Sequence, residues 1–362
     1  MNPLIPAPVP VPLPAPVWLL HLLSVFTFIL HLVPMNFLAG GIVLLCVSAY
    51  RGRHDPRHRE LVRRAAPVMP PVVAAAITLG VAPLLFLQLV YGQLFYTSSL
   101  LMAWGWLSVV FFLLFGYYGL YWFNFHQEEL GPRRFWMMLA TAVMFLLVMV
   151  LFSRNMNFML HPEDFYPRFL AGGAGGFLAP ANPTTWPRLL HMLVGALAVG
   201  GFGLALLSGL WRRESPELAD WARRYGLRWF MGGTGVQLLV GIWFLWRLPV
   251  EIRGHFLGAD KLATAILATA VVLVVLAMLA APRSLAAGAV ALLGTLSLMA
   301  VIRHLVRVAY LRPYFDPRTL PVQGQWVVFV LFAILLVAGL ATLGWMLHQL
   351  FRRAPTPETP ST

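Results

Sequence analysis

Three histidines lie within long apolar stretches of the chain, where they could bind a metal. They are His31, His191 and His304. Each is 20 or 21 residues from an arginine at one end of its stretch, namely Arg51, Arg212 and Arg283. At 1.5 Å per residue, helices would place all three about 30 Å from that arginine, at one level. Such a layer favours a ligand site. The alternative for each histidine is a structural hydrogen bond to a neighbouring helix.

The residues that accompany these histidines narrow the chemistry. The chain has one cysteine, Cys46, and all thirteen Asp and Glu residues fall outside the interiors of the apolar stretches. These facts exclude Cys-ligated iron–sulfur clusters and covalent c-type haem, and they argue against a proton pump, which needs a buried carboxylate. Neutral imidazoles in an apolar slot between helices suit haem iron, so we predict one or two haem b groups.

Arginines at the same level could neutralise the propionates of a haem. Charge-assisted hydrogen bonds from guanidinium groups would compensate these carboxylates at a membrane boundary. For Arg303 and Arg307 the alternative is that they extend to lipid headgroups. The candidate residues are Arg188, Arg303, Arg307 and Arg312.

The elements that must position these residues are transmembrane helices. Hydrophobic residues make up 60% of the 362 residues and charged residues only 11%, which excludes a water-soluble globule. Apolar runs long enough to cross a ~30 Å hydrocarbon layer recur nine times. We therefore predict an all-α polytopic membrane bundle of about nine helices, at 17–49, 68–93, 99–125, 134–153, 188–211, 229–247, 262–281, 285–310 and 325–348.

The net charge of +13 follows the predicted topology. Most arginines fall in alternate connections, such as 51–64, 133–134 and 212–228, and the positive-inside rule makes these connections cytoplasmic. The N-terminus is then outside, the C-terminus inside, and nucleic-acid binding is not expected. We predict a Pro-rich outer arm at 1–16, a single haem-binding domain at 17–350 with an outer loop at 154–187, and a disordered cytoplasmic tail at 351–362.

Several of these segments resemble subunit I of the cytochrome bd-type quinol oxidases. FILHLVPMNFLAGG is similar to the first helix of that family, where a His before Val-Pro ligates the high-spin haem; here this is His31. In GVAPLLFLQLVYG, Gln88 stands in place of a family glutamate. FMLHP resembles the WMxNP motif of the family. The run from Asn182 to His191 keeps the family's spacing up to the histidine that ligates the low-spin haem, which here is His191. DKLATA, with Lys261, resembles the segment that opens the family's quinol loop.

The chain also departs from the family pattern at positions that matter for oxygen. The stretch MAWGWLSVVFF has Trp104 where the family carries a glutamate, and no Met ligand is found in the seventh helix. The long quinol loop is missing, a GRQPW motif is reduced to residues 310–313, and His304 has no family counterpart. The resemblance therefore implies a haem scaffold without an oxygen-reducing site.

We accordingly expect a b-type cytochrome subunit in a bacterial cytoplasmic membrane. His191 would ligate a low-spin haem, with His304 in place of the lost Met, and His31 would ligate a second haem. Electrons would pass between menaquinol or ubiquinol and a c-type cytochrome or other periplasmic redox protein, within a complex that holds another membrane subunit. Weak quinol candidates are Lys261, Arg253 and Glu251. The alternatives are a divergent oxidase and a non-redox membrane subunit or transporter.

Overall fold

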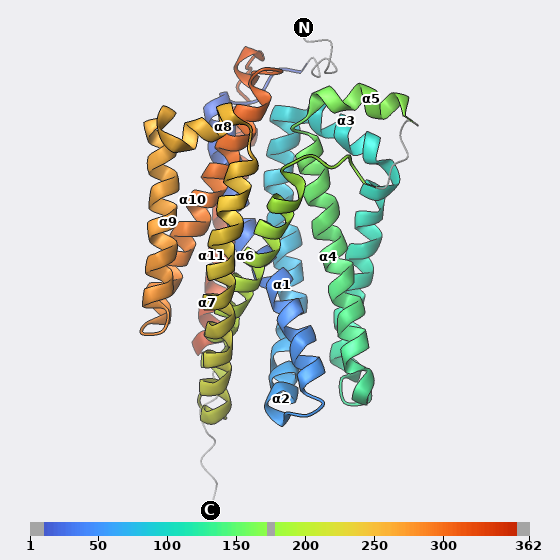
Figure 1. The fold of residues 1–362 in the computed structure, drawn as a ribbon, viewed down its shortest axis with the longest axis vertical. Coiled ribbons are helices and arrows are strands. Elements are labelled where there is room, and N and C mark those ends of the chain that lie inside the picture. The colour runs from blue at the N-terminus through green and yellow to red at the C-terminus, as the bar shows by residue number, and fades with distance from the viewer. Residues whose placement is uncertain (1–10, 172–177, 353–362) are drawn as a thin grey trace, which may run out of the picture.

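The described residues, 11–171 and 178–352 of a computed structural model, form an all-helical bundle, as predicted (Figure 1). In this part of the chain the only β pairing is an isolated bridge between Leu13 and Val322. The helices are α1 (Val17–Arg51), α2 (Pro56–Ala65), α3 (Met69–His126), α4 (Arg134–Phe158), α5 (Phe165–Leu170), α6 (Thr185–Leu207), α7 (Pro216–Arg247), α8 (Val250–Gly254), α9 (Lys261–Ala280), α10 (Leu285–Leu311) and α11 (Trp326–Arg352).

Eight of the described helical segments are long and apolar enough to cross a membrane, against nine predicted stretches. The difference lies in one continuous segment of 71 residues, Pro56–His126. At 1.5 Å per residue this segment would be about 106 Å long, far more than one crossing of a ~30 Å layer needs. Its backbone leaves the helical conformation at Tyr91 and Ala103. The predicted stretches 68–93 and 99–125 are therefore two legs of α3, which lie apart in Figure 1.

The arginine-rich connections gather at the end of the bundle that holds α2, called the α2 end (Figure 1). Arg64 in α2 forms a 2.8 Å ion pair with Glu214, between α6 and α7. Arg53, after α1, donates a 3.3 Å hydrogen bond to the carbonyl oxygen of Pro132, between α3 and α4. Connections far apart in sequence are thus tied together at this end. The opposite end, which holds α5, is called the α5 end.

Helix α1 lies at the centre of the bundle and contacts α3, α4, α6 and α10. Helices α1 and α6 contact each other and cross in Figure 1. Gly40 of α1 and Gly200 of α6 bring their backbones close together. A Cβ atom on Gly200 would lie 2.8 Å from the Cα atom of Gly40, so a side chain at this position would push the helices apart. The two helices are therefore held together by backbone contact at one point.

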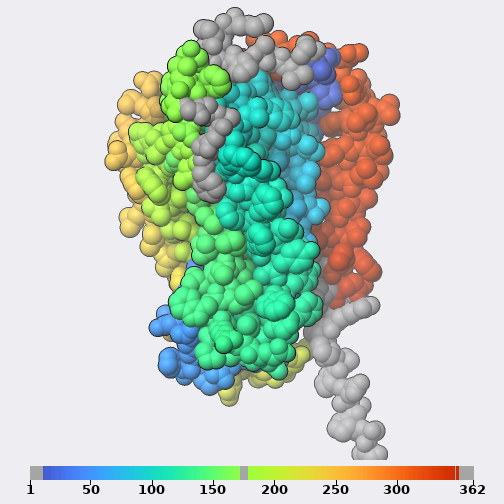
Figure 2. Space-filling view, turned by 90° about the vertical axis from the view of Figure 1, so that its right-hand side faces the viewer, coloured from blue at the N-terminus to red at the C-terminus, as the bar shows by residue number. Residues whose placement is uncertain are grey.

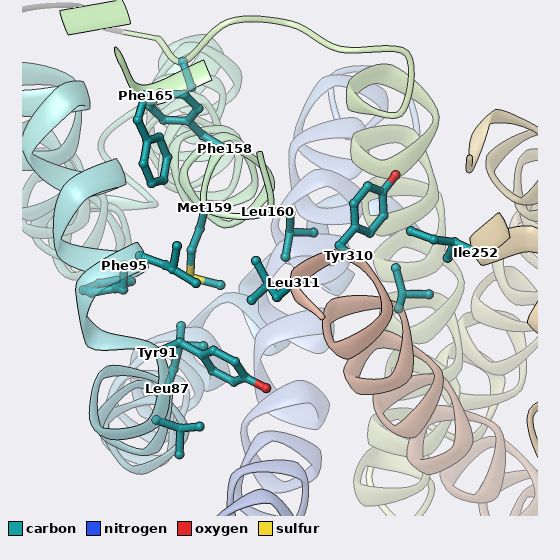
Figure 3. Close-up of a cluster of buried hydrophobic side chains, with 14 of the residues drawn as sticks. Leu87, Tyr91, Phe95, Phe158, Met159, Leu160, Phe165, Ile252, Tyr310 and Leu311 are labelled. Atoms are coloured by element: carbon teal, nitrogen blue, oxygen red, sulfur yellow. The ribbon is translucent and has the colours of Figure 1, made fainter. Parts of the chain in front are cut away.

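A hydrophobic cluster closes the α5 end of the bundle (Figure 3). Tyr91 and Phe95 reach it from α3, Met159 from the segment after α4, and Leu311 from the end of α10. All four are almost completely buried, at 1–2% exposure. Since aromatic and aliphatic side chains from separate helices interlock here, the cluster fixes the relative positions of the helix ends that carry the polar residues described below.

The described part of the predicted outer arm, residues 11–16, packs against the connection between α10 and α11. Leu13 is 2% exposed, and its backbone NH donates a 2.8 Å hydrogen bond to the carbonyl oxygen of Pro321. Residues 1–10 of the arm and most of the predicted tail lie outside the described residues. Helix α11 itself forms an edge of the molecule (red, Figure 2), and none of the described residues in its most apolar window is buried.

Candidate functional site

His31, on α1, points at the first leg of α3 through a direct hydrogen bond. Its Nδ1 atom lies 2.8 Å from the carbonyl oxygen of Ala76. Because a carbonyl can only accept, Nδ1 carries the proton and the lone pair of the neutral ring is on Nε2. Gly80 makes the approach feasible, since a Cβ there would lie only 2.9 Å from Nδ1. A histidine held in this way has the tautomer that a metal ligand needs.

His191, on α6, faces a glycine of α7. A Cβ on Gly241 would lie 3.3 Å from the Cε1 atom of His191, and the ring of Phe244, one turn further, is 6.0 Å from the His191 ring. The Nδ1 atom of His191 is buried and has no hydrogen-bond partner. An unsatisfied buried polar atom costs about 1–3 kcal/mol, so this ring is placed for a partner that the chain does not supply.

The crossing of α1 and α6 sets these two histidines at one level. His31 precedes Gly40 by nine residues, and His191 precedes Gly200 by nine residues. Both helices run from the α5 end toward the α2 end (Figure 1), so each histidine lies about 14 Å from the crossing point on the α5 side. Since crossed helices separate with distance from their contact, the two rings lie where α1 and α6 diverge.

An aromatic ring next to each of these histidines makes a cation–π contact with an arginine. The guanidinium carbon of Arg303, on α10, lies 4.4 Å from the centre of the Phe28 ring, which in turn lies 6.2 Å from the His31 ring. The guanidinium carbon of Arg188 lies 5.1 Å from the centre of the Phe244 ring, the neighbour of His191. Cation–π contacts of this kind hold the charges beside the imidazoles.

Among the described residues, no carboxylate forms an ion pair with Arg188, Arg303 or Arg307. Arg307 is 7% exposed, and the Nε and Nη2 atoms of Arg188 are buried without a hydrogen-bond partner. Arg307 lies within electrostatic range of both other arginines. An arginine within a membrane costs about 2.5–3.5 kcal/mol on insertion scales. Three such residues together favour the binding of an anion with more than one negative charge.

Two other predicted cofactor residues lie apart from this arrangement. Arg312 is exposed beyond the end of α10, near Asp316. Gln88 is half-buried on α3, more than two turns past Gly80. The tryptophan in the family's glutamate position, Trp104, is 68% exposed and follows the break at Ala103. The position itself therefore faces outward.

His304 has neighbours that the sequence did not suggest. Its ring centre lies 4.6 Å from that of His21 on α1, and the Nε2 atom of His21 lies 3.3 Å from the hydroxyl of Tyr91 on α3. His21 precedes His31 by ten residues, about 15 Å along α1. His304 thus shares the level of His21, which is nearer to the α5 end than His31.

Among the described residues, the three predicted quinol residues make no hydrogen bond or ion pair with one another. Arg253 lies over the ring of Trp246 at 4.6 Å and donates to the carbonyl oxygen of the same residue at 3.1 Å. Glu251 and Lys261 are exposed, on α8 and at the start of α9. Their shared feature is their place at the surface of the α5 end.

A small polar network covers the α5 end between α4 and α10. The Nδ1 atom of His161 lies 3.0 Å from a carboxylate oxygen of Glu163. Burial alone would raise the pKa of Glu163, but hydrogen bonds from Tyr314 and His161 lower it overall. Burial, together with the Glu163 carboxylate, raises the pKa of Tyr314 to about 12. Glu163 is therefore ionised and Tyr314 neutral at pH 7.

The residues around His31 and His191 fit a haem group. A porphyrin supplies four nitrogen ligands and needs one or two neutral imidazoles from the protein. His31 offers a free Nε2 lone pair, His191 offers a ring with an unpartnered nitrogen, and both face glycines. The uncompensated guanidinium groups suit carboxylates such as propionates.

No family model matches the chain, and no curated protein matches it. Among solved structures, the chain is similar to the bd oxidase from Geobacillus thermodenitrificans. The similarity covers 95% of this chain and 100% of that chain, with a TM-score of 0.67 and 15% sequence identity. At this identity the likeness concerns the fold alone, so the chain has a fold like that of a bd oxidase, as the sequence resemblance implied.

Proposed function

We propose that this protein is a membrane b-type cytochrome subunit that passes electrons between membrane quinol and a redox carrier. The observation that carries the proposal is the pair of histidines, His31 and His191, at one level on the diverging parts of α1 and α6, each facing a glycine. When bound, haem b supplies reversible one-electron transfer. His31 and His191 would each ligate the iron of one haem b, the apolar helices would exclude water, and Arg188, Arg303 and Arg307 would balance the propionates.

The membrane orientation in this proposal follows from charge. The connections at the α2 end carry most of the arginines, which favours a cytoplasmic α2 end and an outer α5 end. His31 and His191 then lie toward the outer side of a bacterial cytoplasmic membrane, within reach of a c-type cytochrome or another periplasmic redox protein. The exposed apolar surface of α11 offers a contact area for another membrane subunit.

A divergent quinol oxidase is the second candidate, because the similar structure is a bd oxidase. Such an enzyme would have to reduce oxygen without the family glutamates. Gln88 is half-buried and Trp104 is exposed, so among the residues at the family's acidic positions only Gln88 remains inside the bundle. A glutamine cannot deliver a proton by ionising. The electron-transfer function therefore agrees better with the residues present.

The test is to mix the detergent-purified protein with a short-chain quinol while recording the haem spectrum and the oxygen concentration. The proposal predicts that quinol reduces the haem and that oxygen is not consumed beyond the rate of quinol alone. Steady oxygen consumption above that rate would establish the oxidase instead. A protein without Soret absorbance would overturn both redox functions and leave a non-redox membrane subunit.

A further inference from the structure

The cluster of His21, Tyr91 and His304 lies outside the proposed haem ligands and still has the features of a binding site. Three different helices supply it: α1, α3 and α10. The Nδ1 atom of His304 is buried without a partner. Tyr91 lies at the break in α3, with φ −127° and ψ 31°, and its side chain points from the hydrophobic cluster toward α1 (Figure 3). Hydrogen-bonding groups from three helices therefore lie together next to the hydrophobic cluster.

This cluster borders the lipid-facing surface of α1. Trp18, Leu22 and Phe26 lie along one stripe of the helix and are 67%, 57% and 42% exposed. Three residues advance about 300° around a helix, so His21 lies about 60° from Trp18, at the edge of this stripe. His21 lies 30 residues before Arg51, about 45 Å along α1, so it is at the outer headgroup level, where a membrane-soluble molecule can bring a polar headgroup to it from the bilayer.

The charges near the cluster favour a ligand that becomes anionic. Arg307 lies within electrostatic range of His21, Tyr91 and His304, and it has no carboxylate partner among the described residues. Asp316, the acidic residue nearest to His21 and Tyr91, is itself paired with Arg318 at 2.6 Å. A metal dication would be repelled by Arg307, whereas the ring oxygen of a quinone, which gains negative charge on reduction, would be attracted.

We infer that His21, Tyr91 and His304 bind a headgroup oxygen of a membrane quinone. The inference rests on the proposed function and gives it a substrate site within the bundle, in place of the surface residues Lys261, Arg253 and Glu251. Tyr91 donates a hydrogen bond from its hydroxyl group to the quinone, and the two imidazoles provide the remaining hydrogen-bond donor and acceptor atoms. The apolar tail of the quinone lies along the exposed stripe of α1. The site is on α1, ten residues from His31, so a bound quinone is near the proposed haem.

The test measures binding of 2-heptyl-4-hydroxyquinoline N-oxide, a quinol analogue whose fluorescence is quenched on binding, to the detergent-purified full chain. Tyr91→Phe removes only the hydroxyl, and His304→Gln removes the imidazole. Each change is expected to weaken binding about tenfold, which corresponds to about 1.4 kcal/mol. Tyr310→Phe is the matched control, since Tyr310 is another buried tyrosine at the α5 end and its ring packs against that of His161. It should bind as the wild type does.

Three results would overturn the site: no quenching with the wild type, equal weakening by Tyr91→Phe and Tyr310→Phe, or weakening by Lys261→Ala while Tyr91→Phe binds normally. The last would locate the quinone in the loop. Haem absorbance is recorded on the same samples. If the chain lacks haem but binds the analogue in a Tyr91-dependent manner, the electron-transfer proposal fails and the quinone site stands.

Discussion

The Nδ1 atom of His31 donates a hydrogen bond to the carbonyl oxygen of Ala76, 2.8 Å away on a neighbouring helix. This bond fixes both the tautomer and the direction of the ring, because only Nε2 is left as an acceptor. It exists because residue 80, one turn after Ala76, is a glycine. Ala76 and Gly80 of α3 thus position His31 of α1, a candidate iron ligand.

Gly80→Ala is therefore expected to remove the haem held by His31. The new Cβ would lie 2.9 Å from Nδ1 and displace the ring, although alanine in a helix is favoured over glycine by about 1 kcal/mol. The measurement is the haem-to-protein ratio after purification. Gly235→Ala on α7, where a Cβ meets nothing within 4 Å, is the control. A full haem complement in Gly80→Ala would show that His31 does not need this position.

Arg188→Gln is expected to lower the midpoint potential of the haem near His191. A positive charge stabilises the reduced iron, and at about 8 Å with an effective dielectric constant of about 20 its removal costs about 2 kcal/mol, or roughly 90 mV for one electron. A potentiometric titration followed by absorbance measures the shift. Arg312→Gln, at an exposed arginine, should leave the potential within a few tens of millivolts. Equal shifts in both variants would contradict a specific role for Arg188.

The crossing of α1 and α6 predicts an effect on both candidate haem positions at once. Gly200→Ala places a Cβ 2.6 Å from the backbone of Gly40 and Gly41, and overpacking of this kind costs about 1–3 kcal/mol. We expect a lower Tm in detergent and partial loss of both haem groups. Gly232→Ala, with nothing within 4 Å, serves as the comparison. An unchanged Tm would mean that the helices cross elsewhere.

Asp316 gives a prediction for acid conditions. Hydrogen bonds from Arg318 lower the pKa of Asp316 to about 2, from an ordinary value of about 3.9. A lowered folded-state pKa contributes stability above about pH 4 that is lost as the pH falls toward 2. The protection factors for hydrogen exchange of residues 313–325, which are corrected for the pH dependence of the intrinsic rate, should therefore fall over this range in the wild type. Asp316→Asn should exchange faster already at pH 5 and lose the dependence; a dependence that persists would assign it to another carboxyl.

Much of the fold could be predicted from the sequence, because apolar stretches of membrane length are a strong signal. The predicted stretches 134–153 and 285–310 lie within α4 and α10. The two legs of α3 show the limit, because the residue types do not indicate that the connection between them stays largely helical and breaks at Tyr91 and Ala103. The nine predicted stretches thus lie within eight helical segments, because two of them belong to the segment Pro56–His126.

For the candidate site, residue counting found His31 and His191 but not their partners. Gly80 and Gly241 become visible only when the helices are placed side by side, since small residues in apolar helices usually signal packing alone. Counting also did not show that His304 lies beside His21, because it gives depth along a helix and ignores direction around the axis. Its contact with His21 depends on the rotation of α1 and α10, which tertiary packing sets.

The most direct measurement is the haem content of the wild type, His31→Ala and His191→Ala, from oxidised and dithionite-reduced spectra with a pyridine haemochrome assay. We predict about two haem b per chain in the wild type, about one in each variant, and no chlorin band in the red. The account would be contradicted by a wild-type protein that binds no haem, or by variants that both retain the full wild-type content.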